Sequence, residues 1–191
     1  MSNSNKILYE NLKQYAIWYV NKYFTTSENL KNILRKRLVK ITGSNDSQNE
    51  STAKIISEIL EKMKDQNLIN DQNYANIKAR SWNRRGNSVR MILTNLQKKK
   101  IDNTYIKKAL SDLENTLKNP DRHASFAFAK RRRIGPFRNN NHQSSKENLS
   151  KMKKKDMFAL SQAGFGYDIC KWIIEAENDI EKLQSTIEDD L

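Results

Sequence analysis

The sequence predicts an all-α protein built from small helical units, and three observations carry that prediction. Apolar residues recur at helical spacing almost throughout the 191 residues, and no comparable stretch alternates with period two. Five glycines and two prolines are few for folds that need many tight turns. A hydrophobic content of 37% permits a core but favours small packed units over one large globule.

The first 70 residues are expected to form three helices. Steps of three and four place one apolar set on a single helix face, namely Leu8, Leu12, Tyr15, Tyr19 and Tyr23. Thr25 and Glu28 have capping-box spacing before the second helix. Its apolar residues are Leu30, Ile33, Leu34, Leu38 and Ile41. After a polar break at 42–52, the third helix carries Ile55, Ile56, Ile59, Leu60 and Met63.

The same order of helices then recurs twice, which indicates an internal repeat. Tyr74-Ala75 echoes Tyr15-Ala16, and the next helix begins its apolar residues fifteen positions later, at Leu30 and at Val89. Phe126-Ala127 opens a third copy. The second and third copies align at an offset of 64, where Leu93, Leu96, Ile101, Tyr105, Ala109 and Leu110 meet Met157, Leu160, Phe165, Ile169, Ile173 and Ile174.

We therefore predict three tandem three-helix units, helix-turn-helix-like and arranged as an elongated row, at 1–70, 71–119 and 120–191. The third unit has a flexible polar insert near 138–150 and an acidic C-terminal tail. In the 64-residue alignment Lys100 occupies the place of Gly164, so we expect Lys100 to adopt the left-handed backbone conformation or to end its helix differently.

Charge is distributed unevenly along the chain, whose formal net charge is +13. Residues 71–155 carry 22 Lys/Arg and 6 Asp/Glu, whereas residues 156–191 carry 2 Lys and 9 Asp/Glu. A basic middle predicts a polyanionic or acidic partner, and the acidic tail is a candidate competitor for the same surface. Solubility alone is the simpler explanation.

No catalytic constellation is found in the sequence. The two histidines, His123 and His142, have no Cys or carboxylate at metal-ligand spacing, and no Gly-rich phosphate loop is present. Cys170 lies among apolar residues and is expected to be a core thiol. We expect no enzymatic activity, no cofactor and no metal. A single cysteine and the polar N-terminus, which lacks a signal-peptide pattern, favour the cytoplasm.

Two tryptophans invite a second interpretation. Trp18 and Trp82 are able to stack nucleic-acid bases, as in single-strand binders. Their helical spacing with other apolar residues favours core packing instead, and that is the prediction.

Clusters of cations near helix junctions remain as candidate functional residues. The candidate contacts with phosphate or with an acidic protein surface are Arg84, Arg85, Arg90, Lys98, Lys99, Arg131, Arg132 and Arg133. If the units superpose, the arginines at 84–85 and 131–133 occupy matching ends of the first helix of two units. Repeated charge at equivalent places favours a functional role over a merely solvated face.

Several short motifs resemble the RecX regulatory proteins of bacteria. These are "LINDQNYA" (68–75), "RSWNRRGNSVRMILTNLQKKKID" (80–102), "AKRRRIGPFR" (129–138) and "LSQAGFGYDI" (160–169). Their order and spacing extend over most of the chain, and the Arg-Arg-Gly-x-Ser and Ile-Gly-Pro versions look most like alphaproteobacterial members. Asn67 and Lys100 replace two glycines of the family pattern.

The resemblance implies an all-helical cytoplasmic modulator of the recombinase RecA, acting in recombination, DNA repair and the SOS response. It implies binding in the groove of the RecA–DNA filament, suppression of strand exchange and ATP hydrolysis, and direct binding of single- or double-stranded DNA. Most matching residues are expected to be structural: Gly86 supplies a permissive turn, and Asn87 or Ser88 an N-cap.

The leading functional hypothesis is thus a non-enzymatic, monomeric regulator of the RecA filament. A stand-alone DNA- or RNA-binding helical module is the alternative, although no helix shows a convincing base-reading array. A scaffold for an acidic protein, without any nucleic acid, is the third possibility.

Overall fold

The computed structural model describes residues 3–43, 50–138, 146–176 and 179–190, and these residues form helices and no strands. The all-α prediction is confirmed. Most of the polar insert predicted near 138–150, at 139–145, lies outside the described residues. Within these ranges no helix is long and apolar enough to cross a membrane.

Contacts divide the chain into two compact units. The first comprises Met1–Tyr74 with Lys99–Asp102, and the second comprises Ala75–Lys98 with Asn103–Leu191. The predicted division into three repeat units, at 1–70, 71–119 and 120–191, stays a prediction.

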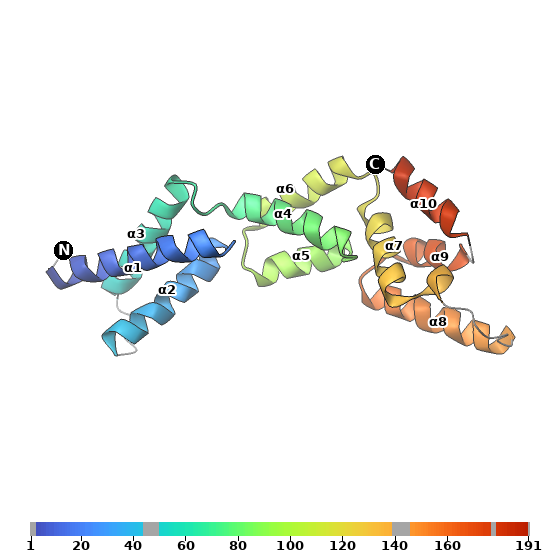
Figure 1. Cartoon of the computed structure of the whole chain (residues 1–191), viewed down its shortest axis with the longest axis horizontal. Helices are drawn as coiled ribbons and strands as arrows, with labels where there is room; N and C mark the ends of the chain where they lie inside the picture. The colour runs from blue at the N-terminus through green and yellow to red at the C-terminus, as the bar shows by residue number, and fades with distance from the viewer. Residues whose placement is uncertain (1–2, 44–49, 139–145, 177–178, 191) are drawn as a thin grey trace. The chain divides into compact units, whose positions relative to one another are not determined.

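Three mutually packed helices form the first unit (Figure 1): α1 (Asn3–Lys22), α2 (Ser27–Thr42) and α3 (Glu50–Asp65). Their shared core includes fully buried leucines from α1 and α2 and isoleucines from α3, among them Leu12, Leu34 and Ile59. The N-cap of α2 is Thr26, whose side-chain oxygen accepts from the Asn29 N–H at 3.2 Å. The capping-box prediction at Thr25 was therefore wrong by one residue.

The second unit contains the remaining helices: α4 (Asp71–Arg84), whose first turn belongs to the first unit, α5 (Val89–Lys98), α6 (Asn103–Thr116), α7 (Pro120–Arg132), the short 3₁₀ helix η2 (Gly135–Phe137), α8 (Lys146–Gln162), α9 (Tyr167–Glu175) and α10 (Ile180–Asp189). Helix α5 packs on α6, and α9 packs on α7, α8 and η2. The core around α7, α8 and α9 buries residues such as Phe128, Leu160 and Ile173.

The 64-residue offset is visible in the backbone as well as in the burial. Helices α6 and α9 begin at Asn103 and Tyr167, 64 residues apart, and Leu96 and Leu160 are both fully buried. Lys100 has φ +55° and Gly164 φ +87°, so the left-handed conformation predicted for Lys100 is confirmed. Asn67, at φ +53°, likewise adopts the conformation of the glycine it replaces.

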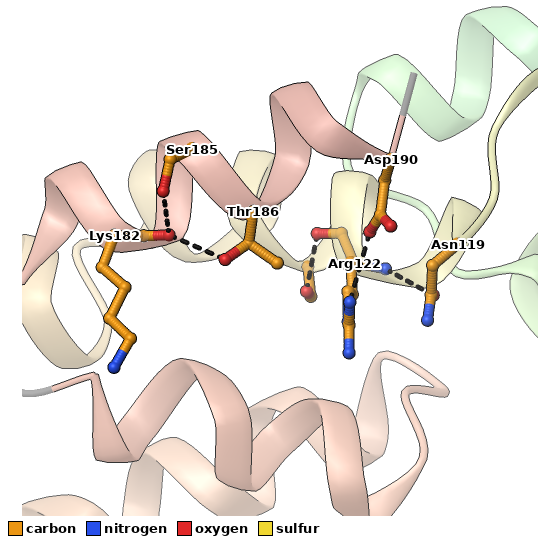
Figure 2. A network of polar contacts seen from close by, with 7 residues as sticks. Asn119, Arg122, Lys182, Ser185, Thr186 and Asp190 are labelled. Atoms are coloured by element: carbon orange, nitrogen blue, oxygen red, sulfur yellow. Dashed lines mark hydrogen bonds and ion pairs between the residues drawn. The ribbon is translucent and has the colours of Figure 1, made fainter.

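The acidic C-terminal segment forms α10, which packs on α7 and buries Leu183 in the same core. Figure 2 shows its anchor: the Asp190 carboxylate lies 3.4 Å from the Arg122 guanidinium of α7. The backbone N–H of Lys118 donates to the Asp190 carbonyl at 2.9 Å. Residues 180–190 are thus a packed part of the second unit.

Candidate functional site

The eight candidate cations are all exposed and lie at helix ends. Arg84 ends α4 and Arg85 follows it; Arg90 lies in the first turn of α5, and Lys98 ends that helix. Arg131 and Arg132 end α7, and Arg133 is its C-cap with φ +55°. Helix ends project side chains beyond the packed faces, so these cations reach solvent without disturbing the core.

A glycine brings two of these clusters together. Gly86, in the turn between α4 and α5, has φ +87°, and a Cβ on it would lie 2.7 Å from the Phe128 backbone nitrogen of α7. Only glycine allows this close approach. The Arg131 guanidinium then donates a hydrogen bond to the Arg85 carbonyl. The permissive turn expected at Gly86 thereby positions the arginines of α4 and α7 beside each other.

An open hollow of about 340 Å³ lies at this junction. It is lined by the α4–α5 turn, by α5 and α7, and by the C-terminal end of α8 with the residue after it. The lining residues are Gly86, Asn87, Met91, Phe128, Arg131, Arg132, Ala159, Gln162 and Ala163. The guanidinium carbons of Arg131 and Arg132 each lie 5.8 Å from the Phe128 ring centroid. Phe128 itself packs edge-on against Phe165 at 5.7 Å, so a rigid core aromatic supports both cations.

Ser88 fixes the start of α5 against the turn between α8 and α9. Its hydroxyl accepts from the Met91 N–H at 3.2 Å, which makes it the predicted N-cap, and donates to the Ala163 carbonyl at 2.7 Å. A Cβ on Gly164 would lie 2.7 Å from the Ser88 oxygen and 3.5 Å from Cβ of Arg90. Arg90 is therefore held beside the α8–α9 turn, within the same unit as the hollow.

We name the set Arg84, Arg85, Arg90, Arg131, Arg132 and Arg133 the arginine surface. None of its members forms an ion pair with a carboxylate among the residues that the structure describes. Arg138, by contrast, lies 2.5 Å from the Asp156 carboxylate, which also accepts from the Gly135 N–H. No carboxylate of the described residues therefore neutralises the arginine surface, whereas Arg138 is neutralised by Asp156.

The two candidate lysines lie elsewhere. Lys98 is eight residues from Arg90 along α5, about 12 Å at the helical rise. Lys99 belongs by its contacts to the first compact unit, as does Lys100, whose ammonium lies 3.5 Å from the Glu28 carboxylate. Arg131 and Arg132 line the hollow, whereas Lys98 is not among its lining residues.

A second basic run was missed from the sequence. Helix α2 carries Lys31, Arg35, Lys36, Arg37 and Lys40 against one acid, Glu28. Lys36, Arg37 and Lys40 are exposed. The run "RKRLVK" at 35–40 is the sequence signal for this surface, and it lies outside the strongly basic segment 71–155.

Among the described residues, the Cys170 thiol and the His123 imidazole are the groups to consider for acid, base or nucleophilic chemistry. Burial raises the pKa of the Cys170 thiol, whose sulfur lies 3.6 Å from the Phe165 carbonyl oxygen in the core. Burial also lowers the pKa of His123, although the nearby Asp190 carboxylate opposes that shift. No cluster of three or more metal-ligating side chains occurs in the described ranges. The arrangement suits recognition of an anion by fixed arginines.

Comparisons with known proteins bear on this arrangement. No family model matches the chain. Its sequence is 27% identical over 165 residues to "Regulatory protein RecX" of Myxococcus xanthus (strain DK1622), covering 86% of this chain and 84% of that protein. Its fold matches the crystal structure of RecX from Lactobacillus salivarius with a TM-score of 0.64, covering 92% of this chain and 99% of that one, at 24% identity. The sequence match and the shared fold agree with the resemblance to RecX regulatory proteins that the motifs indicate.

Proposed function

We propose that the protein regulates the RecA recombinase by binding the RecA–DNA filament through its arginine surface. The observation that carries this proposal is a set of exposed arginines in which Arg131 and Arg132 line the hollow at Gly86, Arg131 contacts Arg85, and Arg90 lies beside Gly164. Such a surface suits the phosphates of filament DNA or an acidic face of RecA. The name of the Myxococcus relative, a regulatory protein, supports a regulatory role over a catalytic one.

The proposed mechanism is mechanical and electrostatic rather than chemical. A bound chain bridges neighbouring RecA protomers in the filament groove, and this bridging disfavours ATP turnover and filament growth. Fixed arginines lose little side-chain entropy on binding because Phe128 and the Arg85 carbonyl already orient two of them. We propose further that the protein acts as a monomer in the cytoplasm, where RecA filaments form, and that it has no catalytic activity of its own.

The test is a RecA ATPase assay on single-stranded DNA with this protein titrated in. Inhibition is expected at ratios well below one chain per RecA protomer. Changing Arg84, Arg85 and Arg131–Arg133 to Glu should abolish it, with helicity by circular dichroism unchanged. Lys107→Glu with Lys108→Glu, on the exposed face of α6, is the matched control and should retain inhibition. Equal inhibition by the arginine variant would refute this choice of contacts.

The alternative is a stand-alone DNA- or RNA-binding module, which the unpaired arginines also suit. The two functions separate when DNA affinity is measured without RecA. With about five phosphates engaged, log K should fall against log salt concentration with a slope near −4 to −5. A flat slope together with RecA inhibition would assign the arginine surface to RecA itself.

A further inference from the structure

An aromatic surface on α1 lies in the first unit, where the proposed function has no contact. Tyr15, Trp18, Tyr19 and Tyr23 share one helix face, and their rings form a continuous cluster. Ring centroids lie 5.4 Å apart for Tyr15 and Trp18, and 4.8 Å apart for Tyr19 and Tyr23. Trp18 is 49% exposed and Tyr23 44% exposed, so the prediction that Trp18 is a core residue was wrong.

The surface is backed by the core and so is held in place. Tyr15 and Tyr19 pack against the buried cluster of the first unit, and they carry Trp18 and Tyr23 on their outer side. The Asn29 side chain of α2 donates to the Tyr19 hydroxyl at 3.3 Å. Large exposed aromatic area on a rigid support is unusual for a face that meets only water, and it marks an interaction site.

Cations border the rings on two sides. The Lys22 ammonium lies 5.3 Å from the Trp18 centroid and 5.5 Å from the Tyr23 centroid. The Arg37 guanidinium carbon of α2 lies 5.0 Å from the Tyr15 centroid. Exposed Lys36 and Lys40 continue the positive charge along α2. Residues 1–43 carry eight Lys/Arg and only two Glu, so the rings are set in a basic surface.

Aromatic faces bordered by cations match one class of ligand better than others. An apolar peptide would leave these cations without partners, and an acidic peptide offers few flat π-faces. A duplex turns its bases inward, whereas a single strand presents both unpaired bases and phosphates. We propose that this surface binds single-stranded nucleic acid through Tyr15, Trp18, Lys22, Tyr23 and Arg37. Bases stack on Trp18 and Tyr23, and Lys22 and Arg37 bind phosphates.

The test uses the full chain without RecA, so its failure is independent of the proposed RecA regulation. In a Trp82→Phe, Trp172→Phe background only Trp18 reports by fluorescence. Titration with an oligo(dT) strand of about 12 nucleotides should quench it. In the natural background Trp18→Ala should weaken binding of the same strand between about fivefold and a hundredfold, measured by anisotropy of a labelled strand.

An abasic strand of equal length separates stacking from charge. Its affinity should be weaker than that of oligo(dT) and unchanged by Trp18→Ala, because it has no bases to stack. Ile7→Ala, which removes an exposed apolar side chain from the same helix, is the matched control and should bind oligo(dT) normally. Unchanged oligo(dT) affinity in Trp18→Ala, or an equal loss for the abasic strand, would overturn the proposal.

Discussion

The Asp121 carboxylate accepts a hydrogen bond from the backbone N–H of Val89 at 2.8 Å, so the first turn of α7 completes the start of α5. Asp71, in the first turn of α4, does the same for Ser27 at the start of α2, also at 2.8 Å. Both carboxylates occupy helix N-terminal turns and act on a helix more than 30 residues earlier in the chain. The same kind of hydrogen bond joins α2 with α4 and α5 with α7, each pair being separated by one intervening helix.

Two replacements of Asp121 should distinguish the effect of its hydrogen bond on stability from the effect of its charge. Asp121→Ala leaves the Val89 N–H without its acceptor and should lower the free energy of unfolding by about 1 kcal/mol. Asp121→Asn retains an acceptor oxygen. Burial raises the pKa of this carboxyl despite the bond from Val89, so ionisation costs stability as pH rises through the folded pKa.

Asp121→Asn is therefore expected to be at least as stable as the natural protein at pH 7, with the difference shrinking as the pH is lowered to about 3 and the natural carboxyl takes up a proton. Urea unfolding at both pH values measures this. An Asn variant clearly less stable at pH 7 would show that the carboxylate charge stabilises the fold.

Lys100→Gly should be neutral or should raise the free energy of unfolding by up to about 1 kcal/mol, because Lys100 holds φ +55°. Its exposed pairing with Glu28 contributes little to offset the gain. Gly164→Ala provides the opposite case: its φ is +87° and a Cβ would meet Ser88 at 2.7 Å, so it should destabilise. Thermal unfolding of both variants tests the alignment of Lys100 with Gly164. A clear loss of stability in Lys100→Gly would contradict that alignment.

Acidification should weaken the packing around α10 through His123. Its Nε2 is buried and has no hydrogen-bond partner among the described atoms, and burial lowers its pKa below 6.5. The unfolded chain therefore binds a proton more readily between the folded pKa and 6.5, so stability falls as pH drops through that window. The expected loss is about 1 kcal/mol or less between pH 7.5 and pH 5.5. His123→Gln should remove this part of the pH dependence of the unfolding midpoint.

Neutralising exposed acids of α10 tests whether they compete with nucleic acid. Glu181→Gln with Glu188→Gln leaves buried Leu183 and the Asp190–Arg122 pair intact, and should raise DNA affinity at low salt if α10 repels phosphate. Truncation after Glu175 confounds this question because it also removes Leu183 from the core. An affinity equal to that of the natural protein at low salt would exclude such competition.

Helical periodicity and the internal repeat were sufficient to predict the all-α fold and the backbone of Lys100, and the motif around Gly86 narrowed the cap to Asn87 or Ser88. They were insufficient to predict that Trp18 is exposed. Apolar spacing identifies the apolar face of a helix, but it does not say how much of that face the small core covers. The interactions of Asp71 and Asp121 also escaped prediction, since each side chain acts on a backbone group distant in sequence.

The sequence identified the candidate cations, but it did not show which of them lie together on one surface. Gly86 decides which of them meet, through a backbone contact with Phe128 that no local pattern encodes. The same limit applies to Arg138, which lies close in sequence to the arginines at 131–133 but is neutralised by Asp156. Distance along the chain was a poor guide for Lys98 and Lys99 as well.

Asp71 and Asp121 each bond to a helix that precedes them in the chain, and this order has a consequence for folding during translation. A nascent chain emerges N-terminus first, so α2 and α5 are complete in sequence before the carboxylates that finish their first turns have been made. We expect α2 to remain frayed at its start until α4 emerges, and α5 until α7 emerges. Folding on the ribosome would then advance in discrete steps, each one closed by an aspartate.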